Sequence, residues 1–189
     1  MRITRILATL IAITSLAAVS ACSGSSSKSA SFNDADVTFA QDMIPHHRQA
    51  TEMAKLADGR SETPEVLELA DQIIAAQQPE IDTMTGWLTS WDEKVASDMG
   101  TGDMGGMEGM DSGMPGMMSG DEMASLEASS GTDFDRQFLT MMVEHHRGAI
   151  EMAQVEEAEG AYDDAVDLAR KIQEDQAAEI ATMERLLQS

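Results

Sequence analysis

Two similar stretches, "MIPHHRQATEMA" at residues 43–54 and "MMVEHHRGAIEMA" at residues 141–153, decide the fold of this chain. They align without a gap at an offset of 99 residues, and identities continue downstream at the same offset. Chance does not explain so many identities, so we interpret the chain as a duplicated helical hairpin. The aligned pairs include Met43 with Met142, His46 with His145, His47 with His146, Met53 with Met152, Gln77 with Gln176, Glu80 with Glu179, and Met84 with Met183.

The spacing of the inward-facing residues in both copies is that of α-helices. In the first helix these positions recur every three or four residues, which is a heptad stripe. They are Phe39, Met43, His46, Ala50, Met53 and Ala57. The second helix repeats the spacing at Ala70, Ile74, Gln77, Ile81, Met84 and Leu88. No run of alternating β-branched residues favours a strand, so we predict no sheet.

Capping residues predict where the helices begin and end. Asn33 or Asp34 is expected to begin the first helix and Gly59 to end it, and Thr63 before Pro64 begins the second. The second copy predicts helices over 133–158 and 162–187. Four amphipathic helices with short hairpin loops predict an all-α fold, a four-helix bundle.

The bundle is expected to be one domain over residues 34–189, with hairpins at 34–91 and 133–189. Pro45 and Pro79 lie inside the first two helices, and we expect Pro45 to kink its helix and Pro79 to disturb the next one. Their aligned positions hold Glu144 and Ala178, so the second copy should be straighter.

The N-terminus resembles a secretion signal over residues 1–21. Arg2 and Arg5 precede an apolar stretch at 6–18, which is too short to span a membrane comfortably. Small residues precede Cys22, as in the bacterial lipoprotein signal, and this predicts cleavage before Cys22 and a lipid on its sulfur; an ordinary signal with a nearby cysteine is the alternative. Residues 22–33 are Ser-rich and predict a tether. We therefore expect an exported protein, anchored in the cell membrane on its extracytoplasmic face.

The net charge of the chain limits which kinds of binding partner it can have. The chain has 12 Lys and Arg against 34 Asp and Glu, a net charge of −22. Nucleic acid is excluded as a partner because its phosphates would be repelled. Cations would be attracted, although a solvated acidic surface explains most of this charge. Cys22 is the only cysteine, so the mature protein has no internal disulfide and no thiolate metal site.

The predicted interior places imidazoles among thioethers in two equivalent sets. His46 and His145 fall on the inward stripe, and His47 and His146 are rotated from it by about 100°. The methionines that share the stripe are Met43, Met53, Met84, Met142, Met152 and Met183. The alternative for each methionine is ordinary core packing, and the alternative for each histidine is a simple buried hydrogen bond.

Polar residues on the paired helices suit a supporting role. Gln77 and Gln176 lie on the stripe, with Glu80 and Glu179 one turn further on. These side chains could accept the second ring N–H of a histidine whose other nitrogen binds a metal.

A methionine-rich segment separates the two copies, within a connector at residues 92–132 that we expect to be flexible. Its Met-x-x-Met spacing lets a mobile chain wrap several sulfurs around one ion. Thioether sulfur prefers soft monovalent ions such as Cu(I) and Ag(I). Low-complexity drift and a protein-binding surface are the alternatives. The candidate ligands here are Met104, Met107, Met110, Met114, Met117 and Met118.

The double His-His motif, after an Asp-x-x-Phe lead, resembles the repeated motif of the domain-of-unknown-function 305 family. The resemblance covers about residues 34–189 apart from the methionine-rich insert. It implies a ferritin-like helical bundle, secreted or membrane-anchored, and a similarity to periplasmic copper-binding proteins that contribute to copper resistance. It also implies a ligand role for eight residues: Met43, His46, His47, Met53, Met142, His145, His146 and Met152.

Together these features predict a lipid-anchored Cu(I)-binding protein, which also takes Ag(I) and serves copper homeostasis or tolerance. It would buffer the metal or exchange it with a protein partner, without an organic cofactor and without catalysis. A structural or interaction lipoprotein is the main alternative. A ferritin-like metal oxidase is disfavoured because it needs Glu-x-x-His motifs, and Met43 and Met142 stand where the glutamates would be. A haem-binding bundle with His and Met axial ligands is the remaining alternative.

Overall fold

The computed structural model describes residues 31–95 and 114–188, and these form five helices. The helices are α1 (Asp34–Lys55), α2 (Pro64–Ser90), α3 (Gly120–Ala128), α4 (Gly131–Glu159) and α5 (Asp163–Leu186). The described part of the chain contains no strand, so the predicted all-α class is confirmed. The predicted signal peptide, Cys22 and most of the tether lie outside the described residues, as do Met104, Met107 and Met110.

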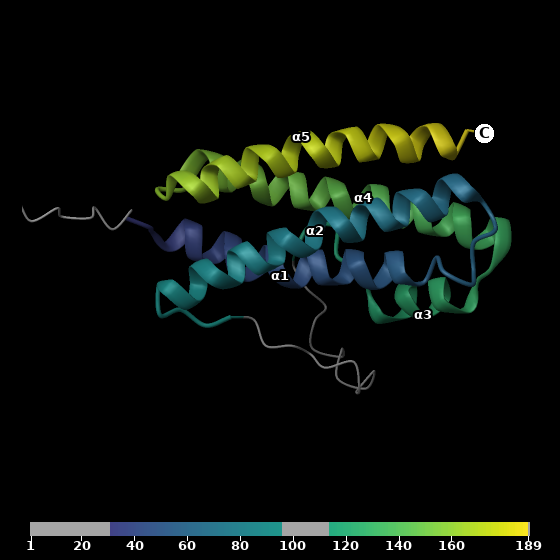
Figure 1. Ribbon diagram of the computed structural model, residues 1–189, viewed down its shortest axis with the longest axis horizontal. Helices are drawn as coiled ribbons and strands as arrows, with labels where there is room; N and C mark the ends of the chain where they lie inside the picture. The colour runs from purple at the N-terminus through teal and green to yellow at the C-terminus, as the bar shows by residue number, and fades with distance from the viewer. Residues whose placement is uncertain (1–30, 96–113, 189) are drawn as a thin grey trace, which may run out of the picture.

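Two helical hairpins pack against each other through their first helices (Figure 1). Helix α1 pairs with α2, α4 pairs with α5, and α1 lies against α4, whereas α2 and α5 touch little. Helices α1 and α4 run antiparallel, because the Asn33 side-chain amide donates to the Glu159 carbonyl at 2.8 Å. At the opposite end the Gly131 amide donates to the Arg60 carbonyl at 2.7 Å. The middle of α1 therefore faces the middle of α4.

Most helix boundaries lie close to the predicted caps. The Asn33 side chain caps α1 in a reciprocal arrangement with Asp36, and Pro64 is the first residue of α2. Helix α1 ends at Lys55 rather than at Gly59, because the Leu56 and Ala57 amides bond three residues back in a tighter turn. Both helices of the second hairpin lie within two residues of their predicted ranges.

The aspartates that lead the two motifs each join one hairpin to the loop of the other. Asp36 accepts hydrogen bonds from the amides of Ala161 and Tyr162, at 3.0 to 3.2 Å. Asp135 accepts one from the Thr63 hydroxyl at 2.5 Å. Thr63 occupies the predicted N-cap position, but its hydroxyl makes this contact and does not cap the helix.

The predicted inward stripe of α1 is buried along its whole length, and none of its six residues is more than 4% exposed. On α2 the stripe differs at one position, where Ile73 is fully buried and Ile74 only partly. Helices α1 and α2 continue without a break through Pro45 and Pro79. The kink at Pro45 and the disturbance at Pro79 stay predictions, because a continuous helix does not fix a bend angle.

The end of the connector is folded, in contrast to the flexible segment expected over residues 92–132. Ser119 and Glu122 cap each other at the start of α3, and Leu126 buries this helix against the core. Before α3, the Met118 side chain is only 9% exposed. The composition of the connector did not predict this, because Leu126, the apolar residue that anchors α3, lies beyond the methionine-rich stretch.

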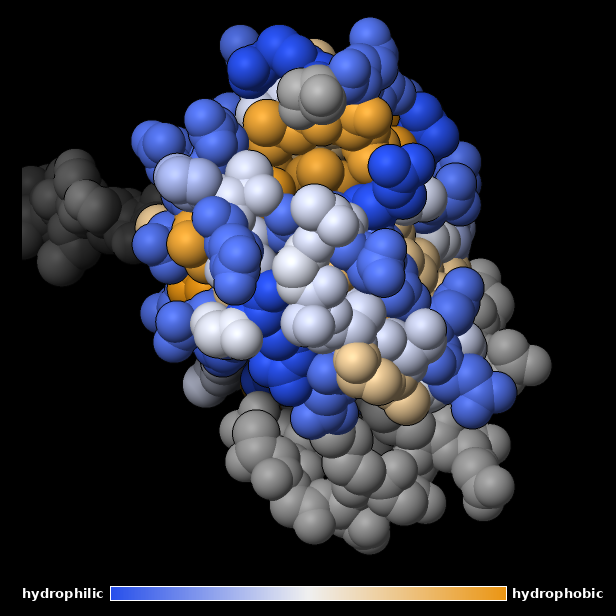
Figure 2. Space-filling view, turned by 90° about the vertical axis from the view of Figure 1, so that its right-hand side faces the viewer, coloured by the Kyte–Doolittle hydropathy of each residue, from blue (hydrophilic) through white to orange (hydrophobic). Residues whose placement is uncertain are grey.

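Figure 2 shows the end of the bundle at which α5 terminates, and most of its surface is hydrophilic. One apolar area is visible in the upper part of this view. Leu187, just past the end of α5, is 37% exposed. Among the described helices, none is both long enough and apolar enough to cross a membrane.

Candidate metal site

The site is built where α1 crosses α4 in the centre of the bundle. His46 on α1 and His145 on α4 bring their imidazole rings together, with centroids 3.8 Å apart and planes tilted by 41°. His47 and His146 flank this pair, and all four side chains are completely buried. The four histidines therefore form one layer across the core, which we call the histidine layer.

The two outer histidines are held by carboxylates on the paired helices. His47 Nε2 donates to Glu80 on α2 at 2.9 Å, and His146 Nε2 donates to Glu179 on α5 at 2.5 Å. The two glutamates thus accept a histidine ring N–H, as expected, and their support of a metal-bound histidine stays a prediction. Each bond leaves Nδ1 as the nitrogen with a free lone pair, because Nε2 carries the proton.

The two carboxylates differ in their charged neighbours. Lys171 of α5 reaches Glu80 at 3.0 Å, and among the described ion pairs Glu179 has only His146. Burial alone would raise the pKa of Glu80, but the hydrogen bond from His47 and the charge of Lys171 together lower it. The two halves of the site are therefore chemically unequal.

Several ring nitrogens in the layer lack a hydrogen-bond partner within the described part of the chain. They are the Nδ1 atoms of His46, His47, His145 and His146, together with Nε2 of His145. A buried polar atom without a partner destabilises the fold unless something else satisfies it. Unpaired imidazole lone pairs in a dry interior are also the groups that a metal ion needs.

Burial keeps the central pair uncharged. It lowers the pKa of His46 to about 3, with a further contribution from His47, and the carbonyl bonded to His46 opposes the shift only in part. Burial and the neighbouring His46 lower the pKa of His145 well below its ordinary value. Both rings are thus neutral at physiological pH, which is the form that binds metals.

The histidine layer divides the apolar core into two clusters, and the methionines of each motif are shared between them. Met43 and Met84 lie in one cluster, with Met152 packed against it. Met53, Met142 and Met183 lie in the other, together with Met118 and Met141. Met53 is fully buried, whereas its aligned residue Met152 is only partly buried.

This sorting differs from the two sets expected from the sequence. Met43 and Met53 belong to one motif, yet they lie ten residues, about 15 Å, apart along α1. Because α4 runs antiparallel to α1, Met152 packs against the cluster that contains Met43, and Met142 belongs to the cluster that contains Met53. Each cluster therefore combines methionines from both motifs with one shared layer of histidines.

The end of the connector lies directly over this layer. We call residues 114–118 the strap. The Pro115 carbonyl accepts a hydrogen bond from His46 Nε2 at 3.0 Å. Gln49 bonds both the amide and the carbonyl of Met118, at 2.7 and 2.8 Å. Met114 and Met117 are half-buried.

Sequence reasoning did not find the residues that hold the strap. Gln49 and Gly148 occupy aligned positions of the two motifs, and both contact it. The only signal was that these two positions differ while their neighbours Arg48 and Arg147 are identical.

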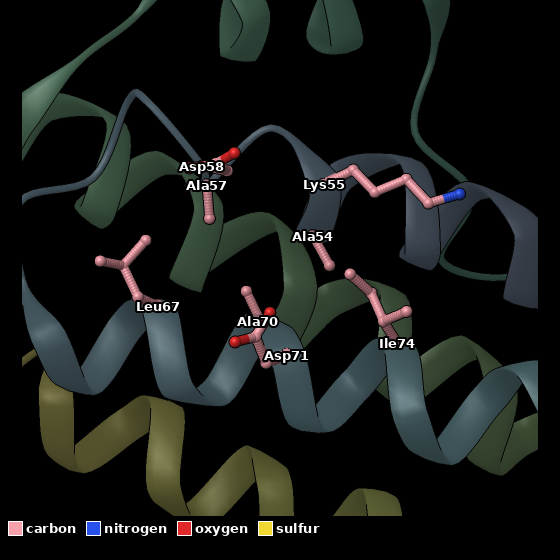
Figure 3. Close-up of a pocket in the computed structure, with 8 residues that line it drawn as sticks. All are labelled: Ala54, Lys55, Ala57, Asp58, Leu67, Ala70, Asp71 and Ile74. Carbon is pink, nitrogen blue, oxygen red and sulfur yellow. The ribbon is translucent and has the colours of Figure 1, made fainter.

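A separate hollow of about 580 Å³ lies between α1 and α2, away from the histidines (Figure 3). Small side chains open it, and Lys55, Asp58 and Asp71 are on its wall. It contains none of the predicted ligands. Within the described ranges, no three His, Cys, Asp or Glu side chains form a ready metal site.

Comparison with known proteins places the chain in a family. The family model described as a domain of unknown function (DUF305) matches residues 36–187. The chain belongs to the DUF305 family. No curated protein matches it.

Solved structures share both the fold and much of the sequence. A DUF305 protein from Streptomyces coelicolor, named as secreted, is 36% identical, with a TM-score of 0.71 over 81% of this chain and 90% of that one. A DUF305 fragment from Deinococcus radiodurans is 32% identical, with a TM-score of 0.71 over 82% and 96%. CopM in its Cu(I)-bound form is 28% identical, with a TM-score of 0.65 over 81% and 95%. CopM has also been solved with silver and with Cu(II).

Proposed function

We propose that this DUF305 protein binds Cu(I), and Ag(I) by the same chemistry, in the core of its helical bundle. The observation that carries the proposal is the set of buried imidazole nitrogens without partners, placed between two methionine clusters. A bound cation would satisfy lone pairs that otherwise destabilise the fold. The similarity to CopM, which has been solved with Cu(I) and silver, supports the same choice of metal.

The ligand chemistry favours a soft monovalent ion. Thioether sulfur is a neutral, polarisable ligand that suits Cu(I), and imidazole binds several copper states. The candidate bundle ligands are His46, His47, His145, His146, Met43, Met53, Met84, Met142, Met152 and Met183. We propose that the cation is the cargo of the protein, which buffers or transfers it and does not use it to turn over a substrate.

Glu80 and Glu179 support this role from behind the histidines. A metal-bound histidine usually gives its other N–H to a carboxylate, which fixes the ring and raises its basicity. His47 and His146 already have this arrangement.

We further propose that the methionine-rich connector captures the ion before the bundle holds it. Met104, Met107 and Met110 supply closely spaced sulfurs, and the described end of the connector contacts the histidine layer. Export and a lipid on Cys22 belong to the same proposal, since the signal-like N-terminus would place this chemistry at the membrane surface. The similar Streptomyces protein that is named as secreted supports export.

The competing function is a structural lipoprotein whose histidines only pack. Competition for Cu(I) between the purified chain and a chromogenic chelator under reducing conditions separates the two functions. The wild type should withdraw Cu(I) from the chelator, and a variant with all four histidines replaced by leucine should lose the tightest fraction. Zn(II) serves as the control metal and should compete more weakly. Equal chelator occupancy with and without protein would reject the proposal.

A further inference from the structure

The strap lies across the seam between α1 and α4, at the point where His46 meets His145. On the α1 side, Pro115 contacts His46, and three residues further along α1 Gln49 bonds the backbone of Met118. Gln49 is only 3% exposed, and its amide offers one donor and one acceptor, as a backbone peptide would. The strap is thus held by buried hydrogen bonds and not by apolar packing alone.

On the α4 side the strap touches the helix backbone. A Cβ at Gly148 would lie 2.0 Å from the Pro115 carbonyl oxygen, and one at Gly116 would lie 2.6 Å from the Glu144 carbonyl oxygen. Gly116 also has a φ of 76°, which side chains rarely adopt. Both glycines are therefore required for this close approach.

The two supports come from aligned positions that have different residues. Gln49 on α1 supplies hydrogen bonds, and Gly148 on α4 supplies space. The histidines, by contrast, are identical in the two copies. The two motif helices are nearly symmetric, but only one strap crosses them. Its α1 side and its α4 side therefore need different residues, which positions 49 and 148 supply.

We propose that the strap is a releasable cover over the His46–His145 pair and that Gln49 is its latch. The cover limits how fast a solute reaches the central imidazoles, and Gln49 is a positioning residue that acts through the backbone of Met118. The identity of that solute as Cu(I) rests on the proposed function. The half-buried Met114 and Met117 on the strap place thioethers on the entry route.

Two variants release the strap by unrelated means. Gln49→Leu removes the two bonds to Met118 and puts an apolar side chain in place of the amide. Two hydrogen bonds of ordinary net strength correspond to about a tenfold to hundredfold change in the open population. Gly148→Ala instead pushes Pro115 away and removes no hydrogen-bonding group.

Each variant has a matched control. Gln41→Leu removes a bond from α1 to the Lys94 carbonyl, which lies outside the strap. Gly86→Ala adds a methyl group to α2 where no atom lies within 4 Å. Far-UV circular dichroism checks that all four variants of the full chain remain helical.

The readout is the reaction of imidazoles with diethyl pyrocarbonate in metal-free protein, located by mass spectrometry. Modification of His46 and His145 should be at least about tenfold faster in both strap variants than in the wild type and both controls. Hydrogen exchange gives a second measurement, because the Met118 amide should be protected in the wild type and exposed in Gln49→Leu. Equal modification rates, or an unprotected Met118 amide in the wild type, would overturn the cover.

Cu(I) association by stopped flow, at a fixed chelator concentration, then separates this inference from the proposed function. Faster association in the two strap variants than in their controls is expected. If the variants speed imidazole modification but no form of the protein takes Cu(I), the cover stands and the proposed function fails. If every form takes Cu(I) at one rate and imidazole modification is also unchanged, the proposed function stands and the cover fails.

Discussion

The imidazoles of His46 and His145 lie against each other with centroids 3.8 Å apart, although the residues are 99 positions apart in the chain. This contact joins the two motifs into one site. Among the described residues, neither ring nitrogen of His145 has a hydrogen-bond partner. The fold therefore buries the polar His145 imidazole completely, and the proposed metal would bind to its unpaired nitrogen.

Replacing His145 by leucine should separate stability from binding. Leucine fills the space and removes two unsatisfied nitrogens, so the metal-free protein should unfold with a free energy equal to or about 1–2 kcal/mol above that of the wild type. Its Cu(I) affinity should fall by at least about tenfold. Urea titration and chelator competition measure the two quantities. A large loss of stability with unchanged affinity would mean that His145 serves only the fold.

Changing the supporting carboxylates tests whether they act through the histidines. Glu80→Gln and Glu179→Gln keep the shape of the side chain but weaken the acceptor for His47 and His146, and each should lower Cu(I) affinity by about tenfold. Glu184→Gln is the control, since it changes an exposed carboxylate that pairs with Arg147 and leaves both histidine contacts in place. Unchanged affinity in both glutamine variants would show that these carboxylates do not tune the site.

Leucine in place of the core methionines tests the sulfurs. Met53→Leu and Met142→Leu conserve volume, so each should change the free energy of unfolding by less than about 1.5 kcal/mol. If sulfur binds the metal, either substitution should weaken Cu(I) binding, and the pair should behave non-additively because both lie in one cluster. Phe138→Leu alters the same cluster without removing sulfur and serves as the control. Full Cu(I) affinity in both methionine variants would assign these residues to packing.

A buried glutamate near the C-terminal end of α4 predicts how the stability of the fold depends on pH. Glu156 is 1% exposed, and burial together with Asp36 raises its pKa from 4.5 to about 8. The folded state therefore holds this proton more tightly than the unfolded chain. The stability that protonated Glu156 gives to the folded state is fully present below about pH 4.5 and is lost as pH rises towards 8.

Glu156→Gln removes this dependence, because an amide donates to Asp36 at every pH. The variant should be more stable than the wild type at pH 7.5 by about 1–3 kcal/mol, and the gap should close towards pH 4.5. Thermal unfolding of both proteins across this range measures the difference. Parallel stability curves would show that Glu156 does not titrate within it.

Much of the fold could be predicted from the sequence because helical spacing is a local property. The stripe from Phe39 to Ala57 already indicated which face of α1 is buried, and a cap at Asn33 or Asp34 indicated where the helix starts. The sharing of methionines between the two clusters could not be predicted this way. It depends on the antiparallel orientation of α1 and α4, and the residue spacing within one helix does not reveal how two helices are oriented.

The strap shows a second limit of local reasoning. Its composition is that of a flexible linker, and its position is set by Gln49 and Gly148, which lie far away in the sequence. Neither residue is a metal ligand by type, so a search for ligands passes over both. The only local sign of the contact was that positions 49 and 148 differ, which is one of several differences between the two motifs.

X-ray absorption at the copper edge, measured on the protein loaded with one equivalent of Cu(I), tests the central claim most directly. Scattering from both imidazole nitrogen and thioether sulfur is predicted, and the nitrogen contribution should decrease when His46 and His145 are both replaced by leucine. A spectrum with sulfur alone in the wild type, or one that this double substitution leaves unchanged, would contradict a metal site at the histidine layer.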